Sequence, residues 1–308
     1  MRIPFLLLSA SLTLPLLLSC GSERNDFDYR EEPDAGNKAF ITATNAGVAA
    51  AETSTIIDMV GLLGTPDERL LDARDITLPC AQLGYGGNGM VTLQGQLQQP
   101  GDKMKIIFNG CTLAGAPLSG TVEATLVEYG QDDTEERYTT RYRYQKFLIG
   151  SGTNLLSLTG SLAVESRYHY QSETSTTTRT STSLQLAQGQ TVLSVEKLEC
   201  IDAYTGVWDT APFTMECQLR FNSLALGGTL SVVTVEPFRG TGGENRPTSG
   251  ELHINGANSK TRFIAQQDGE HVLIQWDQNG DGRFEGQLLR SWDELKQDIL
   301  DWSSLLNP

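Results

Sequence analysis

The chain of 308 residues carries 23 basic and 38 acidic side chains, which gives a formal net charge of −15. So acidic a surface repels nucleic acid and offers no polybasic support for binding to anionic lipids, and we therefore expect no nucleic-acid partner. The length suffices for one large domain or two modest ones.

The first residues of the chain decide the expected compartment. Arg2 gives a minimal positive segment, and residues 3–18 are almost wholly apolar, about the length of the apolar core of a secretory leader. Pro4 and Pro15 interrupt this run, which argues against one straight membrane-spanning helix. An ordinary signal peptide that happens to end near a cysteine is the alternative to lipid attachment.

The apolar run closes with Leu17-Leu18-Ser19-Cys20-Gly21, which resembles the lipobox of bacterial lipoproteins. By this resemblance, residues 1–19 are a lipoprotein signal peptide, and Cys20 becomes a mature N-terminus with a diacylglyceryl thioether and an acylated amine. More than one acyl chain makes membrane residence stable, because each buried methylene contributes about 0.8 kcal/mol. Gly21 stands where an Asp would resemble an inner-membrane retention signal. We therefore expect an outer-membrane lipid anchor in the cell envelope, on the periplasmic side or at the cell surface.

The segment after the leader changes composition twice. Residues 20–38 are polar and acidic without apolar periodicity, and they predict a flexible tether ahead of a single β-rich domain over residues 39–308. Residues 45–63 predict a helix that covers one face of a sheet. Asn45 can cap this helix, and its apolar stripe is broken once, at Glu52.

From Ile76 onward, short alternating runs separated by glycine-rich turns predict a mainly β, β-rich α+β fold. A weak internal repeat links residues 107–128 with 219–236, and its uneven spacing favours a meander of similar hairpins over a solenoid. We expect an antiparallel meander that forms a twisted or half-barrel sheet, with an N-terminal and a C-terminal helix packed on it. The glycine-rich segment 84–89 is followed by neither Lys-Ser/Thr nor a helical pattern, so it predicts a turn and not a phosphate loop.

Four cysteines remain if Cys20 is acylated: Cys80, Cys111, Cys200 and Cys217. An even number in an oxidising compartment predicts structural disulfides. The alternative, a metal cluster, lacks both a C-x-x-C spacing and a nearby histidine. Three pairings are possible, and we favour Cys80–Cys111 with Cys200–Cys217 because each pair brackets one candidate β-unit.

Two polar stretches have more than one interpretation. In residues 137–146, three tyrosines share one face of a predicted strand and three arginines share the other. This strand is either half-buried, with packed rings, or a contact stripe for a glycan, a lipid or another envelope protein. Residues 172–183, rich in Ser and Thr, predict either an exposed two-sided polar strand pair or a mobile loop, because they have no apolar face to bury.

Residues 277–285 (DQNGDGRFE) resemble DxNxDG calcium loops, in which alternate oxygen donors converge on a hard cation. The candidate ligands are Asp277, Asn279, Asp281 and Glu285. Leu288 stands where an EF-hand needs a carboxylate, and the flanking segments look like strands, so we expect a hairpin. Asx-rich turns also close hairpins without metal, so bound calcium is an option and no cofactor is required.

The end of the chain carries a helix signature. Residues 291–294 (SWDE) have the pattern of a capping box, which predicts that a helix begins there and packs on the sheet. Its apolar stripe is expected to consist of Trp292, Leu295, Ile299, Trp302 and Leu306.

Motifs of catalysis are missing from the sequence. No G-x-S-x-G, H-E-x-x-H, Walker or dinucleotide fingerprint occurs, and His169, His253 and His271 lie far apart without ligand spacing. No catalytic residue is therefore singled out, and a carboxylate pair for glycoside chemistry stays open.

Several short features together resemble an uncharacterised group of Gram-negative envelope lipoproteins. They are the lipobox, Cys80 with its glycine-rich turn, Gly101-Asp102 before a β-run that ends at Cys111, and the DxNGDG hairpin followed by Ser-Trp-Asp-Glu-Leu. The resemblance implies a lipid-anchored β-rich protein and supplies no activity. We therefore expect a non-enzymatic binding or structural protein at the outer membrane, held there by its N-terminal lipid, with an envelope protein, lipid or glycan as candidate partner. The alternatives are a calcium-stabilised surface adhesin and a hydrolase of envelope polymers.

Overall fold

The structure is a computed structural model that describes residues 37–63, 69–113, 115–152, 155–206, 210–242 and 246–297. These residues are mainly β, as the alternating runs predict, and they belong to one compact unit. The helical elements are α1 (Ala46–Leu63), α2 (Arg69–Asp72), the 3-10 turn η1 (Cys80–Leu83) and α3 (Trp292–Gln297). The strands are β1 (Ile76–Pro79), β2 (Met90–Gly95), β3 (Lys103–Asn109), β4 (Thr112–Leu113), β5 (Ala116–Gln131), β6 (Glu135–Ile149), β7 (Leu156–His169), β8 (Thr174–Ser181), β9 (Leu184–Gln188), β10 (Thr191–Thr205), β11 (Pro212–Ser223), β12 (Gly228–Thr241), β13 (Pro247–Asn255), β14 (Lys260–Ala265), β15 (His271–Asp277) and β16 (Gly286–Ser291).

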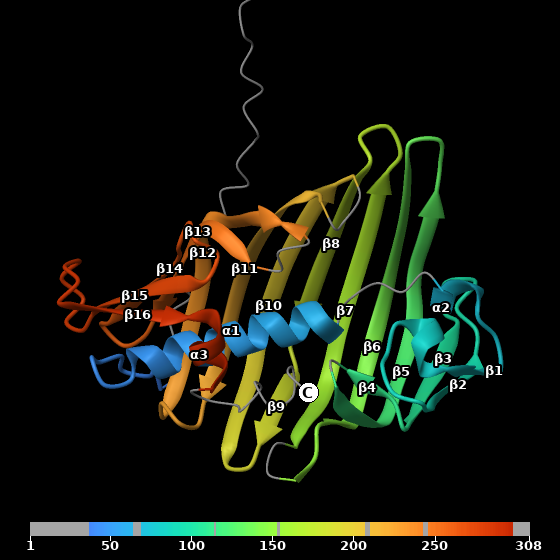
Figure 1. Ribbon diagram of the computed structural model, residues 1–308, viewed down its shortest axis with the longest axis horizontal. Helices are drawn as coiled ribbons and strands as arrows, with labels where there is room; N and C mark the ends of the chain where they lie inside the picture. The colour runs from blue at the N-terminus through green and yellow to red at the C-terminus, as the bar shows by residue number, and fades with distance from the viewer. Residues whose placement is uncertain are drawn as a thin grey trace, which may run out of the picture. The chain divides into compact units, whose positions relative to one another are not determined.

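The strands form one large antiparallel sheet whose order follows the chain (Figure 1). Fourteen strands run in sequence from β1 to β16, and the two short strands β4 and β9 pair beside this path. The sheet is an open one and not a closed barrel. The predicted antiparallel meander is therefore confirmed.

Strand β7 changes partner along its length, because two short strands share one side of it. Its first residues pair with β9, and its last residues, from Ala163 to His169, pair with β8. Gly160 lies at the change with a φ of +115°, and a Cβ there would collide with the backbone oxygen of Ser183. The glycine thus permits the loop between β8 and β9 to approach the backbone of β7.

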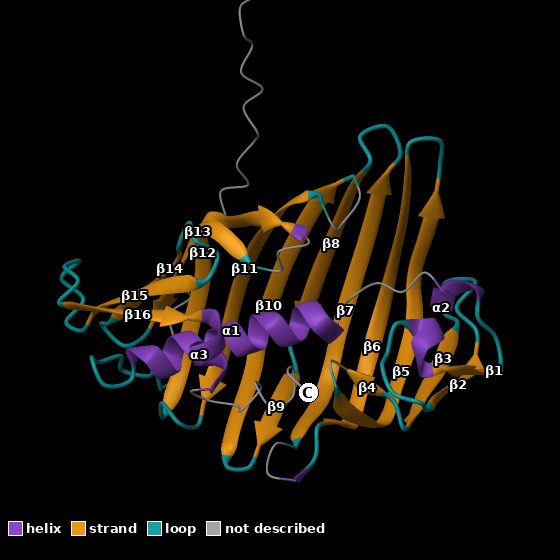
Figure 2. Ribbon diagram, viewed as in Figure 1, coloured by secondary structure: helices purple, strands orange, loops and turns teal. Residues whose placement is uncertain are grey.

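Helix α1 crosses one face of the sheet, which we call the inner face (Figure 2). Early in the helix, Gly47 faces Leu288 of β16; in its middle, Glu52 accepts a hydrogen bond from Ser223 of β11. At its end, the carbonyl of Leu63 accepts a hydrogen bond from the Tyr144 hydroxyl of β6. By length and composition α1 could cross a membrane, but most of it is buried inside the protein. It is therefore the sheet-covering helix that the sequence predicts.

The start of α1 differs from the expected cap. Asn45 directly precedes the helix, and its carbonyl accepts the first helical hydrogen bond, from Ala49. Its side chain, however, bonds backward, accepting from the Thr42 amide and donating to the Phe40 carbonyl. Asn45 therefore fixes the chain that leads into the helix and does not cap the first turn with its side chain.

The short segment before α1 is fastened to the sheet. Thr229 at the start of β12 exchanges hydrogen bonds with Asn37 and Ala39, at 2.8 and 3.0 Å. The Ile41 amide donates to the Ser259 hydroxyl at 2.9 Å in the turn between β13 and β14. Residues 37–41 are thus attached to the sheet at the first residues of β12 and at the turn between β13 and β14.

Helix α3 begins with the predicted capping box. The Ser291 amide donates to the Glu294 carboxylate, and the Glu294 amide donates to the Ser291 hydroxyl. Trp292 and Leu295 are buried, and the Trp292 ring packs edge-on against Phe263 of β14. The C-terminal helix therefore packs on the sheet as predicted, while Ile299, Trp302 and Leu306 lie outside the described residues.

The cysteines of the body form the two favoured disulfides. Cys80–Cys111 joins η1 to the connection between β3 and β4, across a sequence separation of 31 residues that includes the predicted turn at 84–89. Cys200–Cys217 joins directly opposite residues of β10 and β11. By the loop-entropy relation these bonds stabilise the fold by about 3–4 kcal/mol each.

Candidate functional site

The residues that the sequence marks for chemistry lie in separate places. Cys20 lies outside the described residues, so its lipidation stays a prediction. The other four cysteines are occupied in disulfides and hold no metal. The predicted calcium ligands gather in one loop, between β15 and β16.

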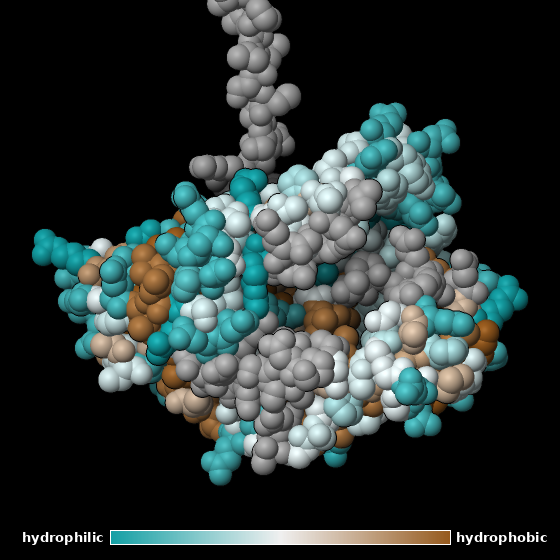
Figure 3. Space-filling model, viewed as in Figure 1, coloured by the Kyte–Doolittle hydropathy of each residue, from teal (hydrophilic) through white to brown (hydrophobic). Residues whose placement is uncertain are grey.

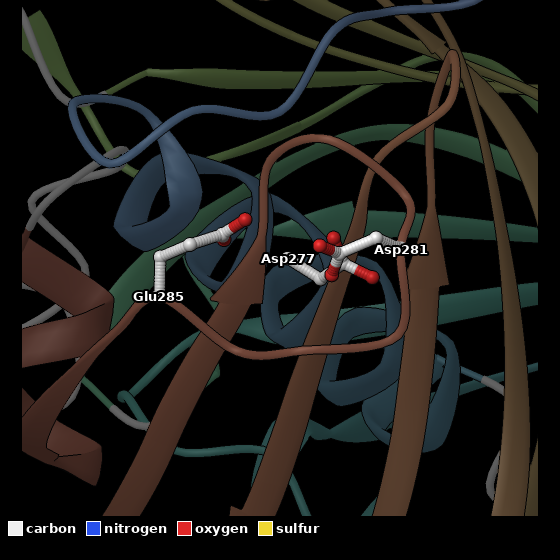
Figure 4. Close-up of side chains that lie close together, drawn as sticks. All are labelled: Asp277, Asp281 and Glu285. Atoms are coloured by element: carbon white, nitrogen blue, oxygen red, sulfur yellow. The ribbon is translucent and has the colours of Figure 1, made fainter.

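The calcium-loop candidates lie on the hairpin loop that connects the antiparallel strands β15 and β16, as expected (Figure 4). Asp277 is buried at the end of β15, and its two carboxylate oxygens accept from the amides of Gly280 and Gly282 at 2.7 and 2.8 Å. Asn279 accepts from the Asp281 amide, and Glu285 accepts from the Gln278 amide. Backbone amides therefore hold the oxygen-bearing side chains in place, as in other Asx-rich turns.

Three carboxylates of this loop converge. Asp277, Asp281 and Glu285 each offer an oxygen, and these oxygens lie within 4.8 Å of one another. Throughout the described parts of the chain, no Lys or Arg forms an ion pair with any of the three. Like charges at this separation repel one another, and a divalent cation that prefers oxygen ligands would offset the repulsion. The loop is the one described place where the sequence motif and the geometry both fit a hard cation.

His253 and His271 each contact a carboxylate. His253 contacts Glu251 at 2.6 Å, and the guanidinium of Arg262 binds both oxygens of that carboxylate, which lowers the pKa of Glu251. Burial lowers the pKa of His253, against the opposing effect of Glu251. His271 pairs with Asp268 at 2.7 Å.

These pairs lack the third member that the hydrolase alternative needs. Among the described residues, neither His253 nor His271 is hydrogen-bonded to a Ser or Thr hydroxyl. Ser291 lies opposite His271 in the strand register, but its hydroxyl accepts the Glu294 amide as the helix cap. Neither of these two histidines is therefore paired with a hydroxyl nucleophile in the part of the chain described.

The tyrosine-rich strand β6 takes the half-buried form that the sequence offered as the alternative to a contact stripe. Tyr138, Tyr142 and Tyr144 are buried on the inner face, whereas the intervening arginines are exposed on the other side. Beyond α1, however, this inner face is polar. The sequence did not reveal which residues of the other strands would lie beside the tyrosines of β6.

Cross-strand register places three rows of side chains on the inner face, beyond the end of α1. The rows span β6, β7, β8 and β10. Tyr144 of β6 contacts the end of α1, and the first row starts at Thr140, the second inward-facing residue of β6 beyond it. The first row is Thr140, Val164, Arg179 and Cys200; the second is Tyr138, Ser166, Thr177 and Asp202; the third is Glu136, Tyr168, Ser175 and Tyr204. We call the polar members of these rows the polar wall: Glu136, Tyr138, Thr140, Ser166, Tyr168, Ser175, Thr177, Arg179, Asp202 and Tyr204.

The polar wall corrects both interpretations of residues 172–183. This stretch contains a single strand, β8, whose alternate residues Ser175, Thr177, Arg179 and Ser181 are all buried. It is neither a mobile loop nor a strand exposed on both sides. Apart from Arg179, these inner side chains are small hydroxyls, and together with Ser166 of β7 we call them the floor of the wall.

One ion pair lies within this floor. The guanidinium of Arg179, whose side chain is 6% exposed, bonds the carboxylate of Asp202, which is 25% exposed. A buried arginine without a counter-ion would be costly, so Asp202 makes the position of Arg179 tolerable. Apart from Glu136 at its margin, the wall thus presents hydroxyls and rings with no net charge.

The space-filling view shows the same side of the molecule as Figure 1, with a hollow near its middle (Figure 3). Hydrophobic and strongly hydrophilic surface are both visible inside the hollow. The inner face is therefore open to solvent over part of its extent.

Comparison with known protein families, with curated proteins and with solved structures gives no match. The resemblance to envelope lipoproteins therefore stays a prediction from short motifs.

Proposed function

We propose that this chain is a lipid-anchored protein of the outer membrane that acts by binding and not by catalysis. In this proposal the acylated Cys20 holds the protein in the membrane, and the polar wall holds the ligand. The lipobox supports the anchor, and the two disulfides fit an oxidising compartment.

The observation that carries the binding role is the polar wall itself. Burial of hydroxyl side chains such as Ser166, Ser175 and Thr177 contributes less to stability than burial of apolar ones, so a purely stabilising role does not account for this end of the inner face. Binding of a ligand that forms hydrogen bonds with these hydroxyls would account for their placement.

Metabolic labelling tests the anchor. Cells that express the full chain are fed an alkyne analogue of palmitate, and the wild type is compared with Cys20→Ala. We expect label in the wild type, none in the variant, and an intact mass without residues 1–19. An unlabelled wild type, or a mature chain that keeps residues 1–19, would contradict the anchor.

A second candidate function is that of a calcium-stabilised surface protein. It is favoured by the converging carboxylates of Asp277, Asp281 and Glu285, which accept backbone amides but form no ion pair with a described Lys or Arg. The loop contacts the segment ahead of α1, because the Gln278 side chain accepts from the Ala43 amide at 3.4 Å. The two candidate functions are compatible, since the loop and the polar wall are formed by different strands.

A further inference from the structure

We propose that the ligand of the polar wall is a neutral, polyhydroxylated chain, that is, an oligosaccharide segment of an envelope glycan. This inference rests on the proposed binding function and names the class of ligand. Three properties of the wall carry it: its hydroxyl groups, its tyrosine rings and its balanced charge.

The hydroxyl groups suit a partner that is itself rich in hydroxyls. Ser166, Ser175, Thr177 and Thr140 each offer one O–H donor and an oxygen acceptor, and they can turn to suit either role. Sugar hydroxyls have the same dual character, so the two surfaces can pair without ionic groups. These residues are only 3–8% exposed, and an acyl chain would cover what remains exposed of their hydroxyls without giving them new partners, which is unfavourable.

The tyrosines supply flat apolar surface beside the hydroxyls. Tyr168 in the third row is 39% exposed, and Tyr129 of β5, opposite Tyr138, is 40% exposed. The Tyr168 ring meets Tyr170 edge-on at 5.7 Å, so its orientation is supported by a neighbour. A tyrosine combines an apolar face, against which the C–H groups of a pyranose ring can stack, with a polar tip.

The charges of the wall disfavour an ionic ligand. Asp202 compensates Arg179, and Glu136 adds one negative charge at the margin. The chain as a whole is strongly acidic, at −15. Anionic glycans and phosphorylated headgroups would be repelled, which leaves a neutral sugar polymer.

The size of the wall fits a short segment of such a polymer. Alternate residues along a strand are about 7 Å apart, so three rows extend over about 14 Å. Neighbouring strands are about 4.8 Å apart, so the four strands β6, β7, β8 and β10 also span about 14 Å. A few linked sugar rings can lie on such an area.

Calorimetric titration of the full mature chain, purified in detergent, tests this inference. The probes are chitohexaose, maltohexaose, cellohexaose and mannohexaose, with a fluorescent fatty acid as the lipid arm. The decisive variants are Thr177→Val and Thr178→Val, which make the same isosteric change on neighbouring residues that face opposite sides of β8. Circular dichroism and melting temperature confirm that each variant is folded.

We expect at least one neutral oligosaccharide to bind the wild type, with Thr177→Val weakening its Kd about 2- to 10-fold, the effect of losing one hydrogen bond. Thr178→Val should leave Kd unchanged. Tyr168→Ala should weaken binding about tenfold or more, as the loss of an aromatic anchor does.

Other outcomes would overturn the inference in different ways. Binding of the fatty acid alone, weakened by Thr177→Val, would keep the binding function but replace the glycan by a lipid. Binding of an oligosaccharide that both threonine variants weaken equally, or that neither weakens, would move the site away from the wall. If none of the probes binds, both the glycan and the proposed binding role of the wall are wrong.

Discussion

Strands β7 and β10 each carry two kinds of inner surface along their length. Toward one end, Leu158 of β7 and Val195 of β10 belong to the hydrophobic core that includes α1. Toward the other end, Ser166 and Asp202 of the same strands belong to the polar wall. On one side of β10 the pairing with β11 extends from Leu193 to Tyr204 and so includes both regions, whereas on the other side the partner changes from β9 to β8.

The difference teaches that this sheet is longer than its core requires. Burial of apolar side chains around α1 can stabilise the fold, because burial of each large apolar side chain contributes about 1.5–3 kcal/mol. The strand segments beyond α1 are positioned by backbone hydrogen bonds of the same sheet. Their side chains are therefore not needed for the core and can serve binding. Stability and recognition are thereby assigned to different ends of the same strands.

The largest expected effect separates these two ends by their contribution to stability. Ile56 is fully buried on α1, so Ile56→Ala removes core contacts and should lower the free energy of unfolding by about 2–5 kcal/mol. Ser166→Ala in the polar wall should cost about 1 kcal/mol or less, since it leaves no cavity. Urea denaturation followed by circular dichroism measures both.

Leu62→Ala is the matched control, because Leu62 lies on the same helix but is 38% exposed. Its effect should stay within about 0.5 kcal/mol. A Ser166→Ala variant as destabilised as Ile56→Ala would show that the wall belongs to the stabilising core.

The next effect concerns the pKa of Glu52, a carboxylate on α1 that is buried in the region where the helix covers the sheet. Burial raises the pKa of Glu52 from 4.5 to about 7, and its Oε2 atom has no partner among the described residues. The unfolded chain releases this proton at lower pH than the folded one. Its favourable contribution is therefore complete below about pH 4.5 and is lost as the pH rises to about 7.

Glu52→Gln should remove this dependence, because glutamine stays neutral. At pH 8 we expect the variant to be more stable than the wild type by about 2–3 kcal/mol, and at pH 4.5 to be similar, on a scale of about 1.4 kcal/mol per pKa unit. Glu251→Gln provides the opposite control. Arg262 lowers the pKa of Glu251, so its contribution is present at neutral pH and is lost as the pH falls. Parallel unfolding curves for wild type and Glu52→Gln across this range would refute the assignment.

The smallest expected effect comes from the loop between β15 and β16. If calcium binds there, an excess of a hundredfold over its Kd should stabilise the fold by about 2.7 kcal/mol at most, and chelation should reverse the gain. Asp277→Asn should abolish the response, while Asp133→Asn, an exposed acid on the β5–β6 turn, should keep it. The melting temperature, recorded with calcium and with chelator, decides; identical values would end the calcium prediction.

Much of the fold could be predicted because its determinants are local. Alternating runs specify strands, the Ser291–Glu294 pattern specifies the start of α3, and paired cysteines bracket neighbouring strands. The loop at Asp277 could likewise be recognised, because its ligands are close in sequence. Each of these features depends on residues within one or two hairpins.

The polar wall and Glu52 could not be predicted in this way, since their burial depends on distant segments. In β8, Thr177 and Thr178 are the same residue type, and only the register with β7 and β10 decides which of them faces inward. In the sequence, Glu52 interrupts the apolar stripe of the predicted helix. In the structure most residues of α1 are buried, and the Glu52 carboxylate accepts a hydrogen bond from Ser223, 171 residues further along the chain. Three-dimensional register is therefore the information that the linear pattern lacks.

The fastening of residues 37–41 to the sheet also has a mechanical consequence. Any pull transmitted along the chain from its N-terminal side reaches the body first at the bonds between Asn37, Ala39 and Thr229, and then at α1. The long ladders of the sheet take the load only afterwards. Tension would thus detach α1 from the sheet before it separated any of the paired strands. The helix would unfold first, and the sheet would remain folded.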